Sequence, residues 1–140
     1  MPFREKSAWV MSLALLSAGI FYFIAVAVIW NESGQLAHPM LPLVIVYTIC
    51  LTIIAALGHA IIAALAPKEA NAPADERELK IIYSAGHYSS HIFAVGTLLS
   101  LGWYLFSGDG DLLFYTVFAS FMAGQIMEYA IQIFLYRTSI

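Results

Sequence analysis

The chain has 140 residues, of which 61% are hydrophobic and 11% are charged, and its formal net charge is −3. A soluble chain is about 45–50% apolar and about 25% charged, so this composition excludes an ordinary soluble domain and indicates lipid as the solvent. The length leaves no room for a separate catalytic or nucleotide-binding domain, and the charge balance gives no basic surface for nucleic acid. We therefore expect a single all-α transmembrane domain over residues 1–140.

Four apolar stretches are each long enough to cross a bilayer, which takes about 20 helical residues. We predict helices over approximately residues 7–31, 40–66, 75–107 and 111–137. Isolated strands cannot span lipid because their backbone polar groups would lack partners, so the expected fold is a four-helix bundle of two antiparallel hairpins. The first stretch is longer than the apolar core of a signal peptide and is expected to stay attached.

The basic residues predict the orientation of the chain. All of them lie at the N-terminus, in the linker 67–80 or at the C-terminus: Arg4, Lys6, Lys68, Arg77, Lys80 and Arg137. The positive-inside rule then places both termini and this linker in the cytoplasm, at the inner membrane of a bacterium or archaeon. Within the linker, Asp75 followed by Glu78 predicts the N-cap of the third long helix.

Ionisable side chains inside spans cost roughly 2.5–3.5 kcal/mol each on insertion scales, and this chain has four: His59, His87, His91 and Glu128. At about 1.5 Å per residue, all of them lie roughly 10–15 Å inside the cytoplasmic boundary. Helical spacing places Ser84 on the face of the last two histidines, and Gln125 and Gln132 on the face of the glutamate. Because lipid offers no hydrogen bonds, we expect the second, third and fourth long helices to enclose these groups, with the first helix as support.

Four interpretations of the expected cluster stay open. The leading one is a metal site, in which His59, His87, His91 and Glu128 bind a divalent transition metal such as zinc and Ser84, Gln125 and Gln132 hydrogen-bond to those ligands. A haem b between His59 and one of the other two histidines is the second, and a proton or ion relay is the third. In the fourth, the polar groups only join helices, and the chain is a non-catalytic structural or regulatory membrane subunit.

Other features carry weaker signals. No nucleophile with an adjacent base and no cofactor motif is apparent, which disfavours an enzyme. Gly86 and Ser90 form a small-xxx-small pair that permits close helix contact within the chain or across a homodimer. His38 is expected to be a solvated loop residue, and Asp109 and Asp111 a turn.

Short motifs near both ends and in the linker resemble a family of small bacterial and archaeal four-helix membrane proteins of unknown function. They are residues 3–10, residues 75–78 and the closing pattern Glu128-Tyr129, Gln132 and Tyr136-Arg137. The resemblance implies the four-helix topology. That family often has a basic residue at the position of Glu128 and an acidic one at the position of Gln125, so the resemblance transfers no site residue.

Overall fold

The computed structural model describes residues 2–138, and every regular element within them is a helix. The helices are α1 (Phe3–Ser33), α2 (Leu41–Leu65), α3 (Pro67–Ala70), α4 (Glu76–Ser107) and α5 (Gly110–Thr138). The helical fold class is therefore confirmed, and α1, α2, α4 and α5 are each long and apolar enough to cross a membrane. The single turn α3 was not predicted. It begins at Pro67, whose fixed φ suits the first position of a helix.

Local sequence signals set the ends of the helices. The backbone N–H of Glu78 donates to Asp75 Oδ1 at 2.7 Å, and the N–H of Asp75 donates to Glu78 Oε2 at 3.2 Å. This reciprocal pair is a capping box, and it confirms the predicted N-cap at the start of α4. Helices α1 and α4 each end at a glycine, Gly34 with φ 71° and Gly108 with φ 66°, a conformation that side chains with a Cβ rarely adopt.

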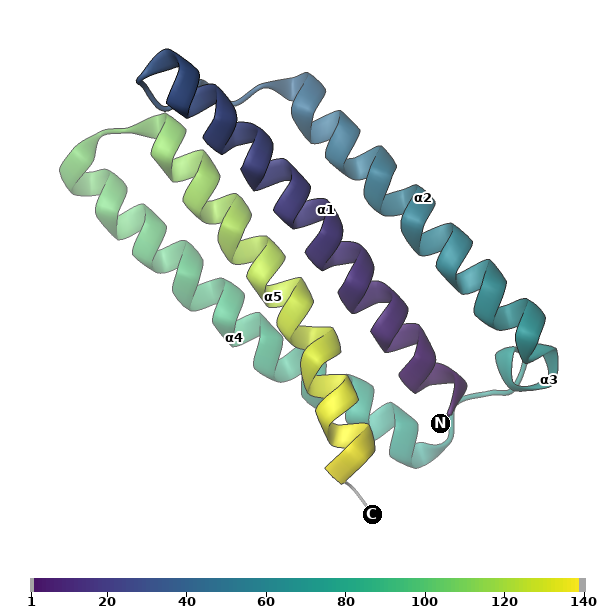
Figure 1. Ribbon diagram of the computed structural model, residues 1–140. Coiled ribbons are helices and arrows are strands. Elements are labelled where there is room, and N and C mark those ends of the chain that lie inside the picture. The colour runs from purple at the N-terminus through teal and green to yellow at the C-terminus, as the bar shows by residue number, and fades with distance from the viewer. Residues whose placement is uncertain (1, 139–140) are drawn as a thin grey trace.

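Helix α1 lies between α2 and α5, and α5 lies between α1 and α4 (Figure 1). Helix α4 packs mainly against α5, at the far edge from α2. In the most apolar part of α1, 39% of the residues are buried, against 6% in α2. The second, third and fourth long helices therefore do not enclose a common space as expected, because α1 lies between α2 and α5. Small buried residues such as Ala14, Ala18 and Gly19 let neighbouring helices approach α1 closely, and in lipid such close packing stabilises helix pairs.

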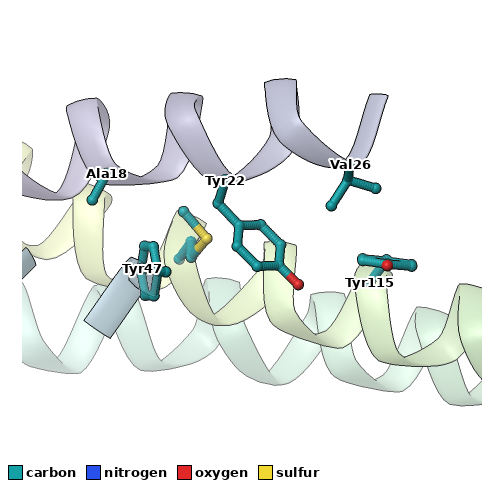
Figure 2. Close-up of a cluster of buried hydrophobic side chains, with 6 residues drawn as sticks. Ala18, Tyr22, Val26, Tyr47 and Tyr115 are labelled. Atoms are coloured by element: carbon teal, nitrogen blue, oxygen red, sulfur yellow. The ribbon is translucent and has the colours of Figure 1, made fainter. Parts of the chain in front are cut away.

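An aromatic cluster joins α1, α2 and α5 (Figure 2). Tyr22 of α1 is 1% exposed, and its ring centroid lies 5.8 Å from that of Tyr47 and 4.8 Å from that of Phe118. Tyr115 donates its hydroxyl to the carbonyl of Ala37 at 3.1 Å. The hydroxyls of Tyr22 and Tyr47 are buried without a hydrogen-bond partner among residues 2–138. The core is therefore held by ring packing more than by polar contacts.

The outward faces of the helices carry large apolar side chains. Examples are Ile53 on α2, Leu98 on α4 and Phe134 on α5, which are between 52% and 67% exposed. Apolar area of this extent on the outside of a small chain is the arrangement expected where the surrounding solvent is hydrocarbon.

Candidate functional site

The structure separates the four ionisable side chains that the sequence predicted to converge. His59 faces α1, His87 and His91 are exposed on α4, and Glu128 is half-buried on α5. Within residues 2–138, no three His, Cys, Asp or Glu side chains lie close enough together to hold a metal ion. The expected four-ligand arrangement is therefore not formed within one chain.

The direction in which α4 faces explains this separation. The side of α4 that meets α5 is lined by small residues, and a Cβ added to Gly96 would lie 2.7 Å from the Cβ of Ser120. Ala85 and Ser89 are buried on α4. His87 follows Ala85 by two positions, and His91 follows Ser89 by two positions. Two positions correspond to about 200° of helical rotation. Packing of the small face against α5 therefore turns both imidazoles away from the bundle.

His59 has both ring nitrogens engaged. Its Nδ1 lies 2.8 Å from the carbonyl oxygen of Ala55, and its Nε2 lies 2.7 Å from Ser7 Oγ on α1. A carbonyl can only accept, so Nδ1 carries the proton and Nε2 accepts from the hydroxyl of Ser7. The adjacent Gly58 allows this approach, because a Cβ there would collide with Val10 of α1. His59 thus fastens α2 to α1, a partnership that no spacing pattern in the sequence signals.

His87, Ser90 and His91 form a polar patch on the outer face of α4, here called the α4 patch. All three are exposed, and the two imidazole centroids are 4.7 Å apart. His91 Nδ1 lies 2.7 Å from the carbonyl oxygen of His87. Since that oxygen can only accept, the proton sits on Nδ1 and the lone pair of His91 Nε2 is free. The exposed rings of Tyr83 and Tyr88 flank the patch.

The other predicted polar residues do not join the histidines. Gln132 is buried, whereas Ser84, Gln125 and Glu128 are half-buried. Across residues 2–138, the side chains of Ser84, Gln125 and Gln132 form no hydrogen bond to a histidine. The sequence therefore placed these groups correctly on their helices but not relative to one another.

Charged side chains gather where the start of α1, the start of α4, the end of α5 and α3 meet. Three ion pairs connect α1 to α4, α3 and α5: Arg4–Glu78 at 3.0 Å, Lys6–Glu69 at 3.8 Å and Arg137–Glu5 at 3.3 Å. The carboxylate of Glu5 is nearly buried, and the guanidinium of Arg137 also lies 5.5 Å from the ring centroid of Trp9. A further pair joins the segment between α1 and α2 to the start of α5: exposed His38 pairs with Asp111 at 2.7 Å. The sequence assigned the basic residues an orienting role, and the structure adds the ion pairs of Arg4, Lys6 and Arg137.

No protein-family model matches the chain, and neither does any curated protein or solved structure. The resemblance to a four-helix family therefore stays a prediction.

Proposed function

We propose that the chain is a four-span protein of the bacterial or archaeal inner membrane, with hairpins α1–α2 and α4–α5 and with both termini in the cytoplasm. The ion pairs support this orientation, because they gather the chain ends, α3 and the start of α4 at one end of the bundle. The basic residues lie in those segments, and the positive-inside rule assigns such an end to the cytoplasm.

We propose further that the protein acts as a non-catalytic structural or regulatory membrane subunit, which binds another membrane helix through the outer face of α4. The observation that carries this proposal is the exposure of the α4 patch within a span. A polar group moved into hydrocarbon without a hydrogen bond costs roughly 2–7 kcal/mol. A neighbouring helix is the usual source of such bonds in a membrane.

Two more features favour this role for α4. A Cβ added to Gly86 would meet nothing within 4 Å, and Ala94 is exposed. The surface beside the patch therefore has no bulky side chain at these two positions. Small residues of this kind let the backbones of two membrane helices come close together. Both ring nitrogens of His59, in contrast, make contacts within the chain. We therefore assign His59 a structural role.

Site-specific photocrosslinking in native membranes tests the proposal. A photoreactive phenylalanine replaces Tyr83, which is 73% exposed beside the α4 patch, and in a matched control it replaces Phe134 of α5, which is 63% exposed. We expect a protein adduct from position 83 and lipid adducts alone from position 134. Loss of the position-83 adduct in the double variant His87→Ala, His91→Ala would tie the contact to the patch. Lipid adducts alone at both positions would overturn the proposal.

A further inference from the structure

We propose that the partner of α4 is a second copy of this chain, and that His87 and His91 of the two copies together bind one divalent first-row metal ion, for which zinc fits best. This inference rests on the proposed role of α4 as a contact face. It replaces the four ligands expected within one chain by two ligands from each of two chains.

The histidine pair has the chemistry of half a metal site. Residues four apart lie on one helical face, and the two imidazole centroids are 4.7 Å apart, so both rings reach the same region outside α4. His91 donates from Nδ1 to the carbonyl oxygen of His87 at 2.7 Å. Metal-bound histidines almost always donate their other ring N–H to a carbonyl, a carboxylate or water. The free Nε2 of His91 is therefore available as a ligand.

The number of ligands argues for a second copy over another partner. Structural zinc sites are nearly always tetrahedral with four protein ligands, and the α4 patch offers two imidazoles. Homodimers are most often related by a twofold axis, which duplicates every ligand. Because the two copies share one membrane orientation, the axis runs along the membrane normal and sets each histidine at the depth of its symmetry mate. A different partner would need its own ligands at that depth.

The position of the patch also suits metal entry and close approach. His87 lies about 10 Å along the helix from Lys80, at about 1.5 Å per residue, so the site is near the cytoplasmic end of the span. Gly86 and Ala94 leave space for the facing backbone beside the ligands. Four neutral imidazoles are a ligand set that suits zinc, copper and nickel.

The test measures metal stoichiometry and oligomeric state on the same preparation. The full chain, purified in detergent without a histidine tag, is titrated with Zn²⁺ and, for its absorption spectrum, with Co²⁺. Light scattering reports whether it is a monomer or a dimer. We expect one zinc per two chains, a tetrahedral Co²⁺ spectrum, and at least about a tenfold loss of zinc affinity in His87→Ala and in His91→Ala. The matched variant His59→Ala removes a histidine outside the patch and should keep the metal.

The outcomes separate this inference from the proposed function. A position-83 adduct of twice the chain mass, together with zinc binding that requires His87 and His91, supports both. If the same adduct forms but the chain binds no more zinc than the double variant His87→Ala, His91→Ala, the metal site is overturned. The proposed contact role of α4 is then still supported. One zinc bound per monomer, or an adduct with a different protein, overturns the second copy. The absence of any protein adduct overturns both.

Discussion

The contact between His59 and Ser7 makes the sharpest prediction about how the bundle is held together. His59→Ala removes the 2.7 Å interaction between Nε2 and Ser7 Oγ, and Ser7→Ala removes the same interaction from the other side. The carbonyl of Ala55 loses only an additional donor, because it also lies within the hydrogen-bonded body of α2. The double-mutant cycle therefore isolates the bond between α1 and α2.

The expected magnitude follows from the geometry of the contact. Interhelical hydrogen bonds in a membrane protein average about 0.6 kcal/mol and reach about 1.7 kcal/mol. This bond is short, joins two part-buried side chains and satisfies the last free nitrogen of the ring. We expect a coupling free energy of about 1 kcal/mol, with each single variant lowering the free energy of unfolding by about 1 kcal/mol.

Equilibrium unfolding in mixed detergent micelles, followed by helical circular dichroism, measures these free energies. Ser7→Ala combined with His87→Ala is the control cycle, because His87 lies on the outer face of α4 and makes no contact with Ser7. Its effects should add to within about 0.3–0.5 kcal/mol. If the effects of Ser7→Ala and His59→Ala add equally well, the two residues are not coupled and the structural role of His59 is refuted.

Two further predictions concern packing, and the same unfolding titration checks both. Gly96→Ala should lower the free energy of unfolding by about 1–3 kcal/mol, because the new Cβ would lie 2.7 Å from the Cβ of Ser120. Gly102→Ala should leave that free energy unchanged or raise it by up to about 1 kcal/mol, since nothing lies within 4 Å of its added Cβ; equal effects at the two glycines would contradict the packing of α4 on α5. Tyr22→Phe should be neutral or stabilising, because the buried hydroxyl has no partner in the described residues. Tyr22→Ala should cost about 3–5 kcal/mol, so a phenylalanine variant that costs nearly as much would mean that the hydroxyl is bonded.

Much of the fold was predictable because its signals are local. Length and apolarity predicted the four long helices, and the predicted ends fall within a few residues of the observed ones. Asp75 and Glu78 predicted the start of α4, because a capping box needs only neighbours in the chain. The turn of α3 at Pro67 lay inside a segment expected to be an irregular linker. This helix has too few residues to show helical periodicity in the sequence.

The candidate site was predictable only in part. The sequence correctly placed His87 and His91 on one helical face, because that relation depends on spacing within a single helix. It wrongly directed that face toward His59, on the assumption that polar groups within spans must meet inside the chain. The assumption omitted another possibility, in which a polar face is left for a partner outside the chain.

By itself, the sequence determined that this chain is helical, where its long helices run and which side chains share a face, because all of these depend on residues a few positions apart. Only the tertiary structure decided that α1 lies between α2 and α5, that His59 bonds to Ser7 and that the histidines of α4 face outward. Those outcomes depend on how helices rotate and pack against one another. In this bundle small residues such as Gly58 and Gly96 govern that packing, since close contact between backbones stabilises helix pairs where lipid removes the hydrophobic drive between helices.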